Sequence, residues 1–123
     1  MATGLENLKI YKLACDLELE VFHLTKLFPN DEKYRSVDQL RRSSSSVSNN
    51  IAESYNKRSP KEKIRFLHDI VKGEAEETKR NLEMCRRKEF HDNVDIIDKY
   101  TDLLKMVSGY VAFIKKGADN AKT

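Results

Sequence analysis

Apolar residues recur at intervals of three and four along most of the chain, and three short polar breaks interrupt them. This spacing places apolar side chains on one face of an α-helix. The breaks fall after Phe28, at Ser59 and around Asp92. No stretch shows sustained alternation of apolar and polar residues, so we expect no sheet. The pattern predicts four helices, at about residues 5–28, 36–57, 60–88 and 93–116.

Helices of this length, joined by short connections, are expected to alternate in direction. Each spans roughly 30–40 Å at 1.5 Å per residue, so consecutive helices lie side by side. We therefore expect a single all-α domain over residues 1–123, an antiparallel up-down-up-down four-helix bundle.

The first predicted helix carries apolar residues on two sides. One stripe comprises Ile10, Ala14, Leu17, Val21, Leu24 and Phe28. The second comprises Leu5, Leu8, Tyr11, Cys15, Leu19 and Phe22. We expect the core to cover one stripe and another subunit to cover the other.

Local signals indicate where the next helices begin. Ser36, with Gln39 three residues later, has the pattern of a capping box, so we expect the second helix to start there. Ser59, Pro60 and Glu62 give a stronger signal for the third helix, because serine caps the first turn and proline suits its first position.

Pro29 is expected to end the first helix, because proline cannot continue a hydrogen-bonded helical turn. The fourth helix is predicted to open near Asp92 or Asn93 and to end at Gly117, a residue type that commonly follows the last turn. Residues 118–123 would then form a frayed tail.

Residues 39–54, QLRRSSSSVSNNIAES, look at first like a flexible linker. On a helical wheel, however, one core stripe forms from Val37, Leu40, Ser44, Val47, Ile51 and Tyr55. The two flanks are Gln39, Ser43, Ser46 and Asn50 on one side, and Arg41, Ser48 and Ala52 on the other. Small side chains let neighbouring helices approach closely, so we predict a packed helix.

The outer face of this helix allows two interpretations. Arg42, Asn49 and Glu53 point away from the core stripe. The charge pattern alone favours a solvated face. Alternatively, another subunit covers this face, with Arg42 and Glu53 paired or hydrogen-bonded across the contact.

Composition narrows the class of protein. Charged residues make up 35% of the 123, and only four Gly and two Pro are present, which suits long amphipathic helices. We expect neither a membrane span nor a secretory signal, and hence a cytoplasmic protein. Cys15 and Cys85 have no metal-ligand partners nearby, so reduced thiols, no metal and no cofactor are expected.

The positive charge is concentrated in one part of the chain. Residues 33–65 carry nine Lys or Arg against three acids, whereas residues 1–32 carry three against six. This asymmetry suggests an anionic partner. The candidate nucleic-acid-binding residues are Arg41, Arg42, Lys57, Arg58, Lys61, Lys63 and Arg65.

The segment LFPNDEKYRSVDQLRRSSSSVSNNIAES resembles the central motif of four-helix-bundle proteins encoded within intervening sequences of bacterial 23S rRNA genes, also called S23-like. The matching positions are Phe28, Pro29, Glu32, Tyr34, Gln39, Leu40, Arg41, Arg42, Ser46, Val47, Asn50, Ile51, Ala52 and Glu53. Later matches are Ser59, Glu62, Gly73, Glu77 and Thr78. Ser54 departs from the pattern, since the family has glycine there.

This resemblance implies a bundle that assembles as a ring-shaped homopentamer without established enzymatic activity. It assigns a structural or oligomer-forming role to Gln39, Arg42, Ser46, Asn50 and Glu53, and it favours a buried role for the Arg42 and Glu53 face. A distant structural relative, the accessory variability determinant of diversity-generating retroelements, is a basic pentamer that binds nucleic acid and a reverse transcriptase.

Three functions are weighed. The first is an oligomeric, non-enzymatic protein that binds RNA or DNA without sequence preference through the basic segment. The second is an assembly or adaptor protein that recruits a protein partner. The third is a helical ribonuclease that uses Arg86 and His91, a short-motif match with a high false-positive rate.

Overall fold

The computed structural model describes residues 4–121, which form four long helical segments and contain no strand. The first comprises η1 (Gly4–Asn7) and α1 (Lys9–Thr25). The second comprises η2 (Asn30–Glu32), η3 (Lys33–Val37) and α2 (Asp38–Asn56). The third comprises α3 (Pro60–Ile64), η4 (Arg65–Val71) and α4 (Lys72–Arg87), and the fourth is α5 (Val94–Ala121).

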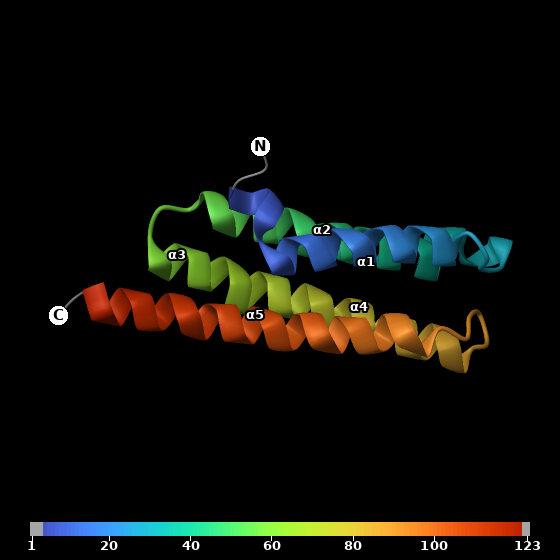
Figure 1. Ribbon diagram of the computed structural model, residues 1–123. Coiled ribbons are helices and arrows are strands. Elements are labelled where there is room, and N and C mark those ends of the chain that lie inside the picture. Colours follow the sequence, from blue (N-terminus) through green and yellow to red (C-terminus); the bar gives the residue numbers. More distant parts are fainter. Residues whose placement is uncertain (1–3, 122–123) are drawn as a thin grey trace.

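The helices lie along one another in an elongated bundle (Figure 1). Helix α1 contacts α2 and α5, and α4 also contacts both α2 and α5. The α1–α2 and α4–α5 connections lie at one end of the bundle, whereas the α2–α3 connection lies at the other end, near the end of α5 (Figure 1). None of the helices that the structure describes combines the length and the apolar character needed to cross a membrane.

The predicted core stripes are buried for the most part. Leu17, Leu40, Ile51, Leu67 and Leu82 have no exposed surface. Each such side chain contributes about 1.5–3 kcal/mol by leaving water. In the fourth helix the core includes Ile96 and Leu103, whereas Val94 is exposed.

The serine tract is a helix, as predicted. Ser43, Ser44 and Ser48 are buried, and their small side chains bring α2 close to its neighbours. The Ser48 hydroxyl donates to the Glu18 carboxylate on α1. On the other flank, the hydroxyl oxygens of Ser43 and Thr78 on α4 lie 2.7 Å apart. The two predicted flanks of α2 therefore face two different helices.

Two predicted helix starts are confirmed. The Ser59 hydroxyl accepts a hydrogen bond from the Glu62 backbone N–H at 3.1 Å, so Ser59 caps α3. The Asn93 side-chain oxygen accepts from the Ile96 N–H at 3.0 Å at the start of α5. Both contacts satisfy N–H groups that have no partner within the first helical turn.

The predicted capping box at Ser36 is wrong. Helical structure begins earlier, and the Glu32 carboxylate accepts from the Ser36 backbone N–H at 3.3 Å and from its hydroxyl at 3.0 Å. Ser36 thus donates to a cap that precedes it. The predicted end at Gly117 is also wrong, because α5 continues to Ala121. Glycine lowers helix propensity by only about 1 kcal/mol, which packing against α3 can offset.

Candidate nucleic-acid interface

The α2–α3 connection is a short extended stretch that carries several cations. Lys57 leaves α2 in an extended conformation, and Ser59 is also extended before Pro60 starts α3. The proline fixes the first helical φ, and the Ser59 cap satisfies a free N–H group. The local sequence therefore forces a sharp change of direction at this end of the bundle.

Five candidate cations surround this connection: Lys57, Arg58, Lys61, Lys63 and Arg65. Within the described residues, none of them forms an ion pair with a carboxylate. Arg58, Lys61 and Arg65 are exposed, and Lys57 and Lys63 are half-buried. These cations therefore make no direct ion pair, although Glu62 and Asp119 lie among them.

The cations that have protein contacts use carbonyl oxygens or aromatic rings. The Lys63 Nζ donates to the Tyr55 carbonyl oxygen at 2.8 Å. Lys57 and Arg65 lie over the Phe66 ring, 4.8 and 5.2 Å from its centre. These contacts hold the charged groups in place without cancelling their charge.

The end of α5 adds two further cations that the sequence did not indicate. Lys61 and Lys115 line one groove of about 470 Å³ between the start of α3 and the end of α5, together with Asp119. Lys116 is exposed beside Lys115. The available signal was the expected bundle topology, which places residues near 115 beside residues near 60.

Arg41 and Arg42 do not belong to this cluster, although the sequence grouped them with it. Arg42 and Lys57 are separated by 15 residues, or about 22 Å along α2. Arg41 holds α2 against α1, since its Nε donates to the Thr25 hydroxyl at 2.9 Å and its guanidinium lies 4.5 Å from the Phe22 ring centre. Arg42 pairs with Asp38 one turn earlier. Of the seven candidates, the five from Lys57 to Arg65 gather at one end.

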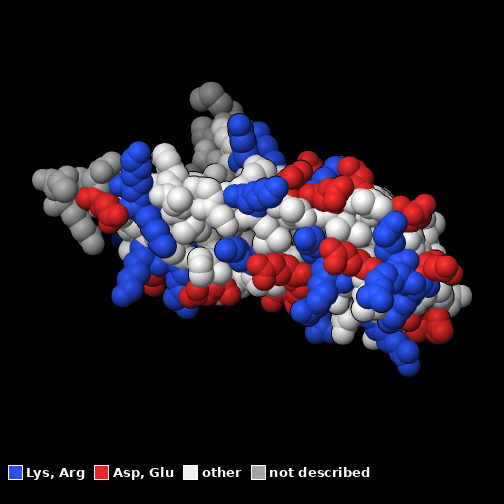
Figure 2. Space-filling view, turned by 90° about the horizontal axis from the view of Figure 1, so that it is seen from below, with Lys and Arg blue, Asp and Glu red and all other residues white. Residues whose placement is uncertain are grey.

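The charges are unevenly distributed over the surface. On the face shown in Figure 2, basic side chains predominate at the end near the C-terminus. Toward the opposite end, acidic and basic side chains are interleaved (Figure 2). The end near the C-terminus is therefore the more strongly basic end of this face (Figure 2).

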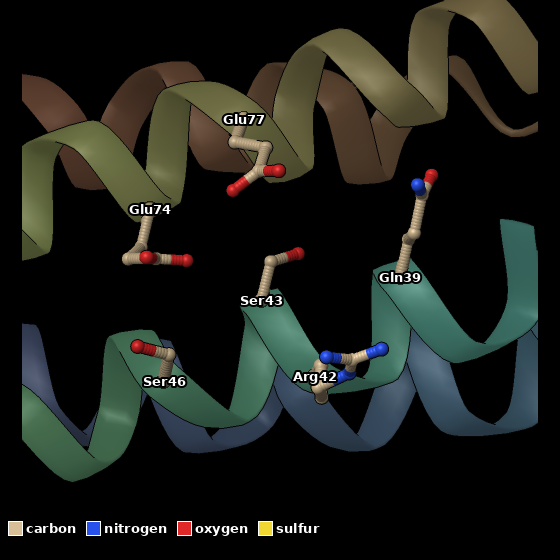
Figure 3. Close-up of a pocket in the computed structure, with 6 residues that line it drawn as sticks. All are labelled: Gln39, Arg42, Ser43, Ser46, Glu74 and Glu77. Carbon is tan, nitrogen blue, oxygen red and sulfur yellow. The ribbon is translucent and has the colours of Figure 1, made fainter.

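The motif residues on α2 mostly border a second, polar groove. Gln39, Arg42 and Ser46 line a groove of about 420 Å³ together with Ser43, Glu74 and Glu77. Glu77 points from α4 toward α2, while Gln39 and Ser43 point toward α4 (Figure 3). Burial, and then the nearby Glu77, raise the pKa of the Glu74 carboxyl. This groove is more acidic than basic, so it does not suit a phosphate.

Asn50 and Glu53, the other two motif residues, lie outside this groove. The Asn50 amide donates to the Ser46 carbonyl at 2.8 Å and stabilises α2 internally. Glu53 is exposed, and Arg42 pairs with Asp38 within its own helix. A pairing of Arg42 or Glu53 with another subunit stays a prediction.

His91 has a structural place in the α4–α5 connection. Its Nδ1 accepts from the Asn93 backbone N–H at 2.9 Å, so the proton is on Nε2, which donates to the Leu82 carbonyl at 2.8 Å. The ring also stacks on Phe28, with ring centres 6.0 Å apart. Both ring nitrogens are engaged with the backbone, which argues against His91 as a proton-transferring group beside Arg86.

The second apolar stripe of α1 is only partly covered. Leu8 and Tyr11 pack against the core, but Leu19 is 58% exposed and Phe22 is 40% exposed. This outer face of α1 is a partly exposed apolar surface, on which Arg41 and Lys26 lie over the Phe22 ring.

A family model described as "23S rRNA-intervening sequence protein" matches residues 6–109, most of the chain. The chain belongs to this family. No curated protein matches it. Among solved structures, it is similar to a protein with unknown function from the S23 ribosomal protein family of Bacteroides thetaiotaomicron VPI-5482. That structure has 24% sequence identity and a TM-score of 0.75, and the match covers 83% of this chain and 97% of the other.

Membership in the 23S rRNA-intervening sequence family confirms the resemblance read from residues 28–53, and the solved structure supports the helical fold. Neither comparison names a ligand or a reaction. Within residues 4–121, no group of three His, Cys, Asp or Glu side chains is arranged to hold a metal ion. The most distinctive chemical feature of the described residues is the group of cations around the α2–α3 connection.

Proposed function

We propose that this protein is a non-enzymatic, oligomeric member of the 23S rRNA-intervening sequence family that binds nucleic acid without sequence preference. The binding surface is the basic end, defined as Lys57, Arg58, Lys61, Lys63, Arg65, Lys115 and Lys116. The observation that carries this proposal is that the cations of the α2–α3 connection gather with no carboxylate partner among the described residues.

Phosphate binding by such a surface is largely electrostatic. Each neutralised phosphate releases a counterion, so the affinity falls as the salt concentration rises. The basic end consists of lysine and arginine side chains around a short connection. This favours contacts with the phosphate backbone over contacts with base edges.

Oligomer formation would multiply this surface. We propose an antiparallel up-down-up-down bundle that assembles through the outer face of α1, where Leu19 and Phe22 are exposed. The family resemblance implies a pentameric ring, which would place one basic end of every subunit on the same rim. Several weak contacts to one polyanion then act together, and the overall affinity exceeds that of a single end.

The test compares two triple variants that change the net charge equally. One replaces Arg58, Lys61 and Arg65 at the basic end with glutamine, and the control replaces Lys33, Arg35 and Arg87 at the opposite end. All six side chains are exposed, so both variants should fold. Binding of a fluorescently labelled RNA is measured by anisotropy over a range of salt concentrations.

We expect the first variant to lose most of its affinity and to show a salt slope lower by about 2, at roughly 0.7 per lost phosphate contact on a single strand. The control should behave like the wild type. Equal losses in both variants would show that only net charge matters, and no binding by the wild type would refute the proposal.

An assembly or adaptor protein is the second candidate, and the exposed apolar face of α1 favours it. Native mass spectrometry of the wild type and of a Leu19→Lys variant tests this role. A wild-type oligomer that dissociates on substitution, without any affinity for RNA or DNA, would favour the adaptor over the nucleic-acid-binding protein.

A further inference from the structure

A row of aromatic rings lies next to the basic end. Phe113 on α5 is 72% exposed, although it is a large apolar side chain. Its ring is nearly parallel to that of Tyr110, at 15°, with ring centres 6.3 Å apart. Burial, and then the neighbouring Tyr55 on α2, raise the pKa of Tyr110. Tyr55 is itself 37% exposed.

Cations accompany this row along its length. The Lys63 Nζ lies 5.4 Å from the centre of the Tyr55 ring. Lys116 follows Phe113 by three residues, which places both side chains on neighbouring positions of one helix surface. A groove of about 380 Å³ beside Tyr110 is lined by Leu8, Met106 and Lys9, among others. Exposed rings, an apolar hollow and lysines thus occur together.

We infer that the basic end takes single-stranded nucleic acid, with unpaired bases stacked on Phe113 and its neighbouring rings and phosphates held by the adjacent lysines. This inference rests on the proposed function and adds the class of nucleic acid. Every base has a flat face, so stacking requires no particular sequence. In a duplex the base faces are covered by neighbouring pairs, and an exposed ring such as Phe113 has nothing to stack against.

The opposite end offers a matched control. Tyr34 is 84% exposed, and the Lys33 Nζ lies 5.5 Å from its ring centre. An exposed ring near a lysine therefore exists at both ends, but of the two rings Phe113 is the one stacked beside another ring, that of Tyr110. Substitutions at the two positions distinguish base stacking at this site from non-specific binding to any exposed aromatic ring.

The experiment uses the absence of tryptophan from this chain. The variants Phe113→Trp and Tyr34→Trp each introduce one fluorophore. They are titrated with a 12-nucleotide single-stranded RNA, with single-stranded DNA of the same sequence, and with the corresponding RNA duplex. We expect both single strands to quench the fluorescence of the Phe113→Trp variant, because a stacked base contacts the indole. The duplex should not quench it, and the Tyr34→Trp variant should not respond.

A second variant measures the contribution to affinity. Phe113→Leu keeps an apolar side chain but removes the ring. We expect it to weaken single-strand binding about 5- to 100-fold, as expected for the loss of one stacked base. Duplex affinity and the salt slope should not change, because no phosphate contact is lost.

The outcomes distinguish this inference from the proposed function. If the wild type binds RNA but Phe113→Leu has no effect and the duplex binds as tightly as the single strand, the stacking inference fails and the proposed function stands. If Phe113→Leu changes the oligomer mass in native mass spectrometry, the ring is a subunit contact and the inference also fails. If the wild type binds no nucleic acid, both the stacking inference and the proposed function are refuted.

Discussion

The connections at the two ends of the bundle are similar in composition but differ in what holds them. The α4–α5 connection is tied down by its own contacts. The Phe90 N–H donates to the Cys85 carbonyl at 2.9 Å, Glu89 adopts a positive φ of 67°, and His91 bonds to the backbone through both nitrogens. The Phe28 ring packs on both Phe90 and His91.

The α2–α3 connection has far fewer constraints. Ser59 caps α3 and Lys63 bonds to the end of α2, but Arg58 and Lys61 are exposed and unpaired with any carboxylate in the described part of the chain. Both connections carry exposed cations without an ion pair among the described residues, including Arg86, Arg87 and Lys88 beside the α4–α5 connection, so the two differ in how firmly their own contacts hold them. Substitutions should therefore affect stability more at the first connection than at the second.

The largest effect on stability is expected from Phe28→Ala, beside the α4–α5 connection. Phe28 is 6% exposed and contacts two rings of the α4–α5 connection. Removing it leaves a cavity, and we expect a loss of about 3–5 kcal/mol in the free energy of unfolding. Urea denaturation followed by circular dichroism, at one fixed protein concentration, measures this change. Phe113→Ala is the control and should stay within about 0.5 kcal/mol.

The next effect is expected from His91→Ala. The variant loses the hydrogen bonds to the Leu82 carbonyl and from the Asn93 N–H, and we expect about 1–3 kcal/mol of destabilisation. His68→Ala serves as the comparison, because the His68 ring is exposed and lies 3.1 Å from the carboxylate of its neighbour Asp69. Similar stability of the two variants would contradict the claim that the contacts of His91 hold the α4–α5 connection in place.

At the α2–α3 connection, Ser59→Ala should have a smaller effect on stability. It removes the cap of α3, which costs about 1 kcal/mol. Ser59→Gly should cost only a few tenths of a kcal/mol, because glycine is also tolerated at this position. Thermal unfolding of both variants tests the ranking, and a larger loss than for His91→Ala would reverse the comparison.

The smallest effect is a gain. Glu89 has a left-handed backbone conformation that glycine adopts without strain, so Glu89→Gly should stabilise the protein by roughly 1 kcal/mol. Glu83→Gly, in the regular and exposed part of α4, should instead destabilise it by about the same amount. Changes of equal sign would show that backbone conformation at Glu89 is not the cause.

The helices were predictable from the sequence because their periodicity is strong. Even the serine tract was recognisable, since Leu40, Val47 and Ile51 repeat at helical spacing and are all buried. The cap at Ser59 was also predictable, because the residues that indicate it are neighbours in the sequence. The start at Ser36 was mispredicted because Glu32, which lies outside the capping-box pattern, provides the cap.

The candidate site was predictable only in part. Lys57 to Arg65 are close in sequence, so their clustering needed no tertiary information. The role of Arg41 depends on Thr25 and Phe22 of another helix, and the contributions of Lys115 and Phe113 depend on what lies beside the end of α5. Such contacts follow from packing, which periodicity alone does not specify.

The most direct test of the central claim is amide hydrogen exchange of the protein, measured by mass spectrometry with and without a single-stranded RNA. The account predicts that the RNA slows exchange in residues 57–65 and near the end of α5, and leaves residues 88–93 unchanged. Slowed exchange at residues 88–93, with no change at residues 57–65, would contradict it.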